Sequence, residues 1–330
     1  MEHIAEKSLS FFKKRSSSVW SVSALAKVSL KKNKIRRAWV QSGFTVLTNS
    51  HASGFLQGKI YTGPAKAVCV PGLNCYSCPG ALGSCPVGSL QAVLGSREFS
   101  MSFYVLGFLA AAGALVGRLV CGWLCPFGLV QDILHKIPFV RKYTKMRADR
   151  VLRWLKYAIL AVFVIALPVW ISDVTGMGDP WYCKYICPSG TLMAGWPLLA
   201  ANASLRRAAG ALFAWKSAIL IAVLLLSISI YRPFCRWACP LGAIYGLMNR
   251  ASFYRLELDR DTCIDCGRCE AACKLGIPVL TDQNSADCIR CGDCTNACPT
   301  GALHSSLDAL LAQKRPDTSH GQTHKSQSSD

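Results

Sequence analysis

The chain has 330 residues, of which 52% are apolar and only 17% are charged. Soluble domains usually carry about 25% charged residues, so this composition excludes a disordered chain or a small disulfide-stapled scaffold and indicates lipid around much of the molecule. The formal charge of +19 is compatible with a nucleic-acid partner, with an anionic membrane surface or with membrane topology, and the positions of the charges decide among them.

The N-terminal segment, residues 1–37, holds ten Lys and Arg residues against two acids and has no long apolar run. A cleaved signal needs an apolar core after its charges, so this segment is predicted to be a basic cytoplasmic arm. Four apolar stretches follow, namely Ala38–Phe55, Ser100–Gly117, Tyr157–Ile171 and Ser217–Tyr231. With their flanks, the last three reach the roughly 20 residues that a helix needs to cross a bilayer. The first is the weakest because it includes four polar residues (Gln41, Asn49, Ser50 and His51).

The loops between these stretches alternate in charge. Loops 58–99 and 175–214 carry three Lys or Arg residues each, whereas loop 121–156 carries eight. Since cytoplasmic loops carry the basic excess, four transmembrane helices are predicted, in the inner (cytoplasmic) membrane with both termini in the cytoplasm. Buried core helices of a soluble protein are the alternative, although such helices are rarely uncharged on every face. No nucleic-acid partner is expected, because no groove-binding motif or aromatic-interleaved basic patch occurs.

A Cys-Pro-x-Gly motif, followed one residue later by an aliphatic side chain, occurs four times, at Cys85, Cys125, Cys187 and Cys239. Three copies have another cysteine four residues earlier (Cys121, Cys183 and Cys235). Cysteines four residues apart can lie one turn from each other at a helix end. The proline suits a helix break because it fixes φ and has no N–H to donate.

Topology predicts how these cysteines group. Cys121 and Cys125 follow the second span, and Cys235 and Cys239 follow the fourth, so both pairs face the cytoplasm. These four thiols match the ligand number of one [4Fe-4S] cluster, and we call them the inner site. Free cysteines packed at helix ends are the alternative.

The remaining cysteines of the membrane region are predicted at the opposite face, where we call their location the outer site. Cys183 and Cys187 are expected to be joined there by two or more of Cys75, Cys78 and Cys85, with Cys69 the weakest candidate. Disulfides compete with a cluster, because that compartment can be oxidising. About 30 Å of hydrocarbon would separate the two faces, so direct electron transfer needs an intermediate carrier or deeply inset clusters.

Two copies of one four-cysteine run lie near the C-terminus, at 263–273 and 288–298. In this spacing, three thiolates bind one cubane and the fourth points at the other cluster. Cluster site 1 is therefore assigned to Cys263, Cys266, Cys269 and Cys298, and cluster site 2 to Cys288, Cys291, Cys294 and Cys273. Zinc would need only paired Cys-x2-Cys sites and not this doubled register. Lys274 stands where the first run usually has proline, and it would place positive charge near cluster site 2.

These motifs, together with the stretch Asn74-Cys75-Tyr76-Ser77-Cys78-Pro79, resemble the NapH/NosR-type membrane polyferredoxins over about residues 38–304. The resemblance implies electron transfer between a membrane donor, such as quinol or a reduced carrier, and a redox enzyme or maturation system. The chain shows no flavin-binding domain of the NosR kind, so it looks closer to the shorter NapH-like members. It has three Cys-x3-Cys-Pro motifs where NapH-like proteins typically have two, and a specific role in nitrate reduction therefore does not follow.

We therefore predict a predominantly α-helical integral membrane protein with four transmembrane helices and a small α+β ferredoxin-like domain at the C-terminus. The expected domains are a basic arm (1–37), the membrane domain (38–250), a two-cluster ferredoxin domain (251–304) and a polar, disordered tail (305–330). The expected cofactors are [4Fe-4S] clusters, two in the ferredoxin domain and one or two at the membrane edges, with iron bound through the cysteines named above.

The predicted function is that of a quinol dehydrogenase-like electron-transfer component that has no catalytic residues of its own and is not a stand-alone enzyme. Its expected partners are membrane lipid, a redox partner protein and quinone. One alternative is a metal-ion reductase or cofactor-maturation factor that uses the outer cysteines. Another is a redox sensor, although the sequence contains no kinase, DNA-binding or nucleotide-binding module.

Overall fold

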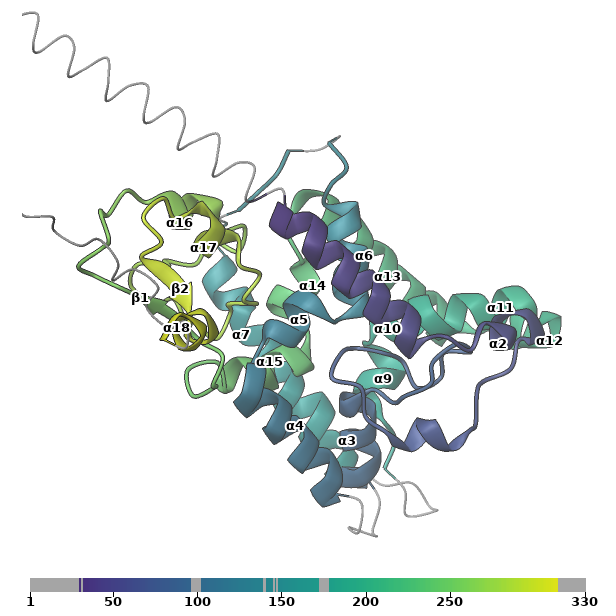
Figure 1. Ribbon diagram of the computed structural model, residues 1–330. Helices are drawn as coiled ribbons and strands as arrows, with labels where there is room; N and C mark the ends of the chain where they lie inside the picture. Colours follow the sequence, from purple (N-terminus) through teal and green to yellow (C-terminus); the bar gives the residue numbers. More distant parts are fainter. Residues whose placement is uncertain are drawn as a thin grey trace, which may run out of the picture.

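The computed structural model describes residues 30, 32–95, 102–138, 141–144, 146, 148–171 and 178–313. Helices dominate this part of the chain, and a small domain with a two-stranded sheet packs against one side of them (Figure 1). The described residues include a helix over 32–48, followed by α2 (Ala52–Gln57), η1 (Pro64–Ala67), α3 (Pro86–Gly95), α4 (Ser102–Val116), α5 (Leu119–Trp123) and α6 (Pro126–Leu134).

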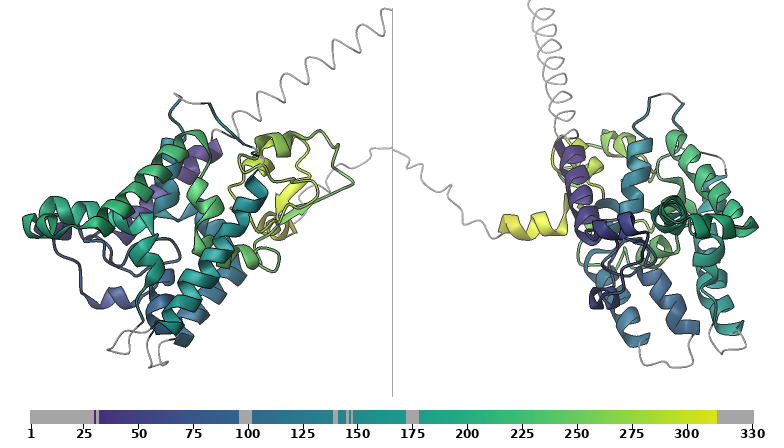
Figure 2. Two further views of the ribbon diagram at one scale, coloured as in Figure 1. Left: turned by 180° about the vertical axis from the view of Figure 1, so that it is seen from behind. Right: turned by 90° about the vertical axis from the view of Figure 1, so that its right-hand side faces the viewer.

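The second half of the helical part contains its two longest helices. The first runs through α7 (Asp149–Ile159), the π-helical η3 (Leu160–Ala166) and α8 (Leu167–Trp170), and the second is α13 (Ala211–Ser229). Between and after them lie α9 (Trp181–Tyr185), α10 (Pro188–Gly190), the π-helical η4 (Thr191–Gly195), α11 (Trp196–Ala201), α12 (Ala203–Ala208), α14 (Pro233–Trp237) and α15 (Pro240–Leu247). Figure 2 shows α11 and α12 at the end of the molecule away from the small domain.

Two helices of the described chain, Asp149–Trp170 and Ala211–Ser229, are long and apolar enough to cross a membrane by length and composition. Their side chains are mostly exposed, and Trp154 and Trp170 of the first helix are 69% and 82% accessible. The apolar helix over Phe103–Val116 is shorter than the roughly 20 residues that a span needs. The expectation of four transmembrane helices is therefore not confirmed.

The predicted span Ala38–Phe55 is not one helix. Its first helix ends at residue 48, and α2 begins only at Ala52. The amide of Asn49 bonds back to the Thr45 carbonyl, whereas the N–H of His51 donates to Gly80 O in a different segment. The polar residues that made this segment the weakest span candidate therefore end its first helix, because their side chains compete for backbone hydrogen-bonding groups.

Each complete Cys-x3-Cys-Pro motif folds in the same way. The first cysteine lies on a five-residue helix (α5, α9 or α14), and the second is the extended N-cap of the next helix, whose first residue is the proline. The N-cap cysteine Cys125 has φ −68° and ψ 119°. Proline favours this arrangement because position N1 needs no N–H donor. Two short helices thus present both thiols of a motif from one turn.

The small domain is the ferredoxin-like unit. Its strands β1 (Leu256–Leu258) and β2 (Leu303–Ser305) pair antiparallel, and its helices are α16 (Arg268–Ala272) and α17 (Asp293–Ala297). Gly267 and Gly292 precede the two helices with φ of 67° and 77°, a conformation that favours glycine. Helix α18 (Ser306–Gln313) follows β2, so the predicted tail begins as a helix, and the rest of it lies outside the described residues.

The ferredoxin-like unit shares a core with the helical part. Its residues Leu275, Ile277 and Ile289 belong to the same buried cluster as Val120 and Phe127 of the helices. Burial of one such aliphatic side chain contributes about 1.5–3 kcal/mol. The close approach requires glycine, because a Cβ at Gly122 would collide with the Ile289 carbonyl. The two parts are therefore packed directly against each other.

Candidate functional site

Cysteines from both C-terminal runs surround two cavities in the ferredoxin-like unit. One is lined by Cys263, Cys266, Cys269 and Cys298, the residues assigned to cluster site 1. The other is lined by Cys273, Cys288, Cys291 and Cys294, the residues assigned to cluster site 2. Each run therefore gives three thiols to one cavity and its fourth thiol to the other. The structure thus brings together both predicted ligand sets.

The thiols of these two sites differ in their ease of ionisation. Burial raises the pKa of Cys291 to about 12, and the nearby Asp293 carboxylate adds to the shift. Burial also opposes ionisation of Cys298, but hydrogen bonds from the Leu303 N–H and from Thr300 outweigh it and lower the pKa of this thiol. Lys274 lines the cavity of cluster site 2, so the residue that replaces the usual proline does place a cation there.

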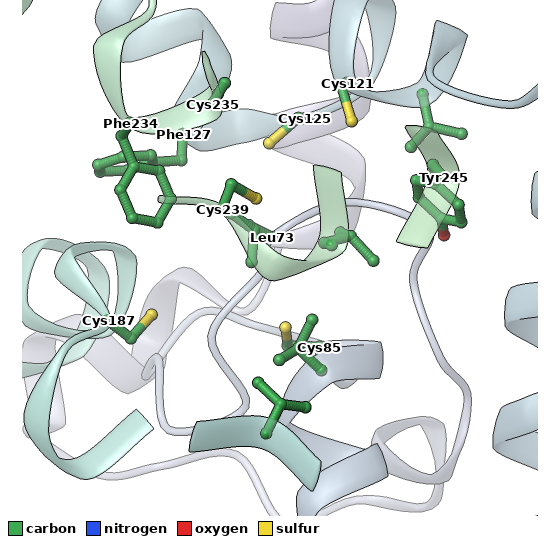
Figure 3. Packing of buried hydrophobic residues seen from close by; sticks show 14 of the residues in the cluster. Leu73, Cys85, Cys121, Cys125, Phe127, Cys187, Phe234, Cys235, Cys239 and Tyr245 are labelled. Carbon is green, nitrogen blue, oxygen red and sulfur yellow. The ribbon is translucent and has the colours of Figure 1, made fainter. Parts of the chain in front are cut away.

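The inner site gathers its four predicted thiols in the buried core (Figure 3). Burial raises the pKa of Cys235 to about 12, and the neighbouring thiols of Cys125 and Cys121 contribute. Burial and the neighbouring Cys235 and Cys121 raise the pKa of Cys239, while the Gly242 N–H donates to its Sγ at 3.3 Å. Because iron binds thiolates, such thiols must lose their protons when a cluster is inserted.

Two fully buried arginines hold the backbone of the inner site. Arg232 donates to both carboxylate oxygens of Asp132, at 2.8 and 2.6 Å, and to the carbonyl of Cys121. Arg118 donates to the carbonyl of Cys235 at 2.8 Å. A cluster with four thiolate ligands carries net negative charge, so buried guanidinium groups beside its ligands favour its binding. Sequence reasoning missed these arginines, since an isolated Arg carries no spacing signal.

The outer site forms around a cavity of about 380 Å³. Four thiols line it, namely Cys75, Cys85, Cys183 and Cys187, together with Asp179, Lys184 and Lys216. Cys78, which the sequence included as a candidate, does not line this cavity. Cys69 does not line this cavity either, and its backbone pairs with that of Ser84 in an isolated parallel β-bridge. All 18 cysteines lie in the described residues and are free thiols in this structure.

The inner and outer sites share one buried core, which is the deeply inset arrangement that the sequence left open. Leu73, which is 2% exposed, lines the outer cavity and donates its N–H to the thiol of Cys125 in the inner site. Figure 3 shows Leu73 between Cys239 and Cys85. Tyr182 is buried against thiols of both sites. The short helices α9 and α10 carry their cysteines back into the core, which loop counting could not reveal.

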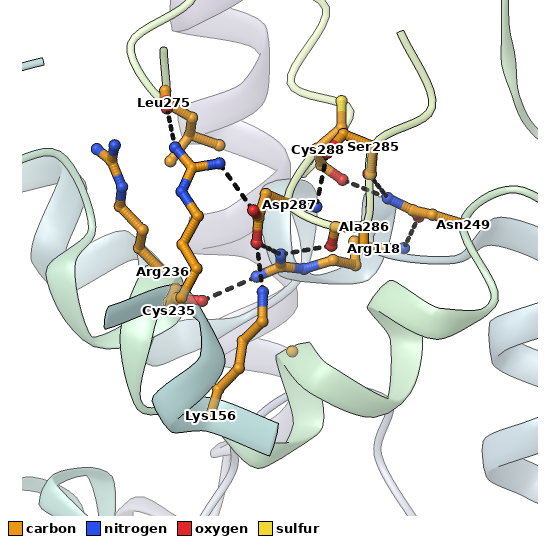
Figure 4. Close-up of polar contacts among 12 residues, drawn as sticks. Arg118, Lys156, Cys235, Arg236, Asn249, Leu275, Ser285, Ala286, Asp287 and Cys288 are labelled. Carbon is orange, nitrogen blue, oxygen red and sulfur yellow. Dashed lines mark hydrogen bonds and ion pairs between the residues drawn. The ribbon is translucent and has the colours of Figure 1, made fainter. Parts of the chain in front are cut away.

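Polar contacts also join the inner site to cluster site 2 (Figure 4). Arg118 donates to the Ala286 carbonyl at 2.8 Å and lies 3.6 Å from the carboxylate of Asp287, the residue directly before Cys288. Asp287 also pairs with Lys156 and with Arg153, which approaches it to 2.7 Å. Burial opposes ionisation of Asp287, but Lys156 and Arg118 outweigh it and hold the pKa of the carboxyl below its ordinary value.

The four sets of thiols fit iron–sulfur clusters by their donor chemistry. Each set has four cysteines, and a backbone N–H group reaches a sulfur in every set. The donors are Gly242 to Cys239, Arg290 to Cys288, Leu303 to Cys298 and Gly88 to Cys85. No three His, Cys, Asp or Glu side chains of the described residues are placed to hold a single metal ion. A cubane spreads its ligands farther apart than one ion does.

The comparison with known families supports the same cofactor. A 4Fe-4S binding domain matches residues 98–146, 158–201 and 213–256, and each of these ranges contains one complete Cys-x3-Cys-Pro motif. A second 4Fe-4S binding domain matches residues 283–304, which include the second C-terminal run. No solved structure matches the chain.

Several curated proteins are similar to about half of the chain. The putative electron transport protein YccM of Escherichia coli is 30% identical over 180 residues, which are 50% of this chain and 43% of YccM. The methylamine utilization ferredoxin-type protein MauN of Paracoccus denitrificans is 30% identical over 160 residues, 48% of each chain. The ferredoxin-type protein NapH of Haemophilus influenzae is 28% identical over 168 residues, 50% of each. The chain thus spans about half the length of the curated relatives it matches.

Proposed function

We propose that this chain, which is a NapH/NosR-type polyferredoxin and a ferredoxin-type electron-transport protein, relays electrons between a membrane donor and a redox partner protein. Four [4Fe-4S] clusters would serve the relay, held by cluster sites 1 and 2, the inner site and the outer site. A cluster of this kind accepts and returns single electrons at a potential that its surroundings set. The chain's own residues bind the iron, exclude water and compensate charge.

The observation that carries this proposal is the continuity of the four sites. Cluster sites 1 and 2 exchange their fourth cysteines, so they are neighbours within one small domain. Ile289, next to Cys288 of cluster site 2, packs against Gly122, next to Cys121 of the inner site. Leu73 then connects the inner site to the outer cavity. No stretch of hydrocarbon has to be crossed between consecutive sites.

Charge and burial suit the inner site to electron transfer. Its four thiols are each at most 5% exposed, so water is kept from the iron that they would bind. Arg118 and Arg232 hold positive charge beside the ligands through the backbone carbonyls of Cys235 and Cys121. Reduction adds a negative charge, and buried cations lower the energetic cost of that step.

Lipid is the proposed surroundings of the two long apolar helices, Asp149–Trp170 and Ala211–Ser229. Their exposed apolar side chains form a surface that water would disfavour. We place the protein in the inner membrane, with the ferredoxin domain and both termini in the cytoplasm, as the distribution of basic residues suggests. The proposed donor is a quinol, and the acceptor is a redox protein that contacts one of the terminal cluster sites.

A second function is favoured by the size of the outer cavity. At about 380 Å³, and with Asp179, Lys184 and Lys216 in its lining, it has polar groups besides its thiols. A metal ion or a small thiol substrate could be reduced there, as expected for a metal-ion reductase or a cofactor-maturation factor. The outer thiols would then bind substrate and not a resident cluster.

Anaerobic purification with iron and sulfide analysis and EPR tests the proposal. Four cubanes predict about sixteen iron atoms per chain, and a substrate-binding outer site predicts about twelve. About eight iron atoms would contradict both membrane-edge clusters. Quinol oxidation by the reconstituted protein then supports the relay, whereas failure with several quinols together with reduction of a metal ion supports the second function.

A further inference from the structure

Two fully buried glutamines lie beside the membrane-edge sites. Gln91 and Gln131 are both 0% exposed. Each stands six residues after the cysteine of a Cys-Pro-x-Gly motif, Gln91 after Cys85 and Gln131 after Cys125. Burying a carboxamide is costly unless its polar atoms find partners, so the partners show what each side chain does.

In both cases one partner is a cysteine sulfur of the facing motif. Gln131 Nε2 donates to Cys235 Sγ at 3.1 Å in the inner site. Gln91 Nε2 donates to Cys183 Sγ at 3.3 Å in the outer site. Each glutamine therefore reaches from the motif on its own helix to the leading cysteine of the motif that completes the same site.

The other two motifs lack this donor. The residues six positions after Cys187 and Cys239 are Met193 and Tyr245. Each site consequently combines one motif that has a glutamine with one motif that does not. The arrangement repeats at two sites whose motifs come from different helices, and chance placement of a buried polar side chain does not explain that repetition.

Backbone groups contact both carboxamides. Gln91 Oε1 accepts from the Tyr182 N–H at 2.9 Å, directly before Cys183. Its Nε2 also donates to Val87 O at 3.3 Å, one turn back on α3. Gln131 Nε2 makes the matching bond to Phe127 O on α6 at 3.4 Å. Gln131 Oε1 has no hydrogen-bond partner among the described residues, so its carboxamide is held through Nε2 alone, whereas both ends of the Gln91 carboxamide are bonded. In both residues an N–H is directed at sulfur.

We propose that Gln91 and Gln131 are matched positioning residues that raise the reduction potentials of the outer and inner clusters by hydrogen bonding to one thiolate ligand of each. Such a bond withdraws negative charge from sulfur and stabilises the more negative reduced state, and hydrogen bonds to the sulfurs are among the factors that set these potentials. The inference rests on the proposed function, because it requires clusters at both sites.

The test is an EPR-monitored redox titration of the full-length, anaerobically purified protein. Gln131→Met removes the donor while keeping an unbranched side chain, and Met193 shows that the chain accepts methionine at the equivalent position. The expected result is a more negative potential for the inner signal alone. Gln91→Met should shift the outer signal alone, so each variant is the control for the other.

Gln41 offers a further matched control. It is also buried beside the inner site, at 1% exposure, but its Nε2 donates to the Cys125 carbonyl at 3.4 Å and not to a sulfur. Gln41→Met should leave the inner potential nearer to that of the unchanged protein than Gln131→Met does. An equal shift in both would mean that any loss of a buried amide has this effect, and it would overturn the proposal.

Folding and cofactor content are checked by iron analysis and by the signals of cluster sites 1 and 2. Gln131→Leu and Gln91→Leu serve as second variants. An unshifted potential overturns the proposal, and so does loss of iron from a site in both of its variants, because the glutamine would then be structural. Absence of membrane-edge signals from the unchanged protein would instead contradict the proposed function.

Discussion

Arg118 Nη2 donates a 2.8 Å hydrogen bond to the main-chain carbonyl of Cys235, while the other end of the same guanidinium bonds to Ala286 O. One buried side chain thus holds an inner-site cysteine and the segment that leads to Cys288 of cluster site 2. Its backbone N–H is fixed in turn by Asn249 Oδ1 at 2.9 Å. Burial opposes its charge, but Cys121 and Asp287 outweigh that effect and raise the pKa of Arg118.

Arg118→Leu should therefore weaken the packing of the ferredoxin domain against the helical part. Asp287 would lose one cation and two buried carbonyls would lose their donor, at a cost of about 3–5 kcal/mol. We expect faster release of the domain by limited proteolysis. Arg250→Leu is the control, since its ion pair with Asp282 has an arginine side chain that is 78% exposed and so contributes little. Equal proteolysis rates in the two variants would contradict this role for Arg118.

Gly122→Ala should separate the inner site from cluster site 2. An added Cβ would collide with the Ile289 carbonyl. Because this carbonyl belongs to the backbone, it cannot rotate away from the Cβ as a flexible side chain could. We expect weaker magnetic coupling between the two clusters in the EPR spectrum of the fully reduced protein. Gly107→Ala is the control, because nothing lies within 4 Å of its Cβ position and alanine there should be neutral or stabilise by about 0.4–1 kcal/mol. Unchanged coupling in Gly122→Ala would argue against direct contact.

Asp132→Asn should destabilise the protein by about 3–5 kcal/mol, because it leaves Arg232 and Arg37 buried without their shared carboxylate. Burial opposes ionisation of Asp132, but Arg232 and Arg37 hold its pKa below the ordinary value. This stabilisation is therefore present above the unfolded pKa of about 3.9 and is lost as the pH falls through the lower folded value.

Thermal unfolding of the detergent-solubilised protein at neutral and acidic pH measures this effect. Glu257→Gln is the control, since its partner Arg255 and the glutamate are 54% and 39% exposed. The difference in unfolding temperature between Asp132→Asn and the unchanged protein should be smaller at acidic pH than at neutral pH. A gap that is constant with pH would mean that the carboxylate charge does not matter.

Cys75→Ser and Cys78→Ser form a matched pair for the outer site. Cys75 lines the cavity and Cys78 does not, although both come from the same Cys-x2-Cys stretch. We expect Cys75→Ser to lose about four iron atoms and one EPR signal, since a cubane contains four irons, and Cys78→Ser to lose neither. Loss of iron in Cys78→Ser, with none in Cys75→Ser, would reverse the assignment.

Cluster insertion should depend on pH differently at different sites. Burial raises the pKa of Cys235 and of Cys85 to about 12, whereas the pKa of Cys298 is lowered. Only the thiolate binds iron, so insertion at the inner and outer sites releases protons near neutral pH and is favoured by higher pH. In reconstitution of the apo-protein from about pH 7 to about pH 9, the membrane-edge signals should rise more steeply than that of cluster site 1. Parallel rises at all sites would contradict this expectation.

The resemblance to NapH-type proteins could be recognised from the sequence, because the cysteine motifs are local patterns, and it is confirmed by relatives that are 27–30% identical. Four transmembrane helices could not be deduced in this way. Asn49 and His51 break the first segment, and α4 is only 15 residues long. Hydropathy describes what surrounds a segment and does not show where its helix ends.

Cys78 and Gln131 show where sequence reasoning about the site stopped. Cys78 has the spacing of a ligand, but Cys75 lines the outer cavity and Cys78 does not. Gln131 was overlooked, although its place six residues after Cys125 recurs at Gln91 after Cys85 and was visible in the sequence. A glutamine can be identified as a hydrogen-bond donor to sulfur only when its partner is known, and the partner of Gln131, Cys235, lies 104 residues away in the sequence.

The sequence by itself determined the chemistry of this protein, because thiolate number and spacing are local properties and short loops can satisfy them. It therefore predicted the eight ferredoxin cysteines and their crossed grouping, and it predicted the four inner cysteines. Only the tertiary structure decided that the outer cysteines lie in the same core as the inner ones, with Leu73 between them. Distances between segments far apart in the chain depend on how the helices pack, and no local pattern encodes that packing.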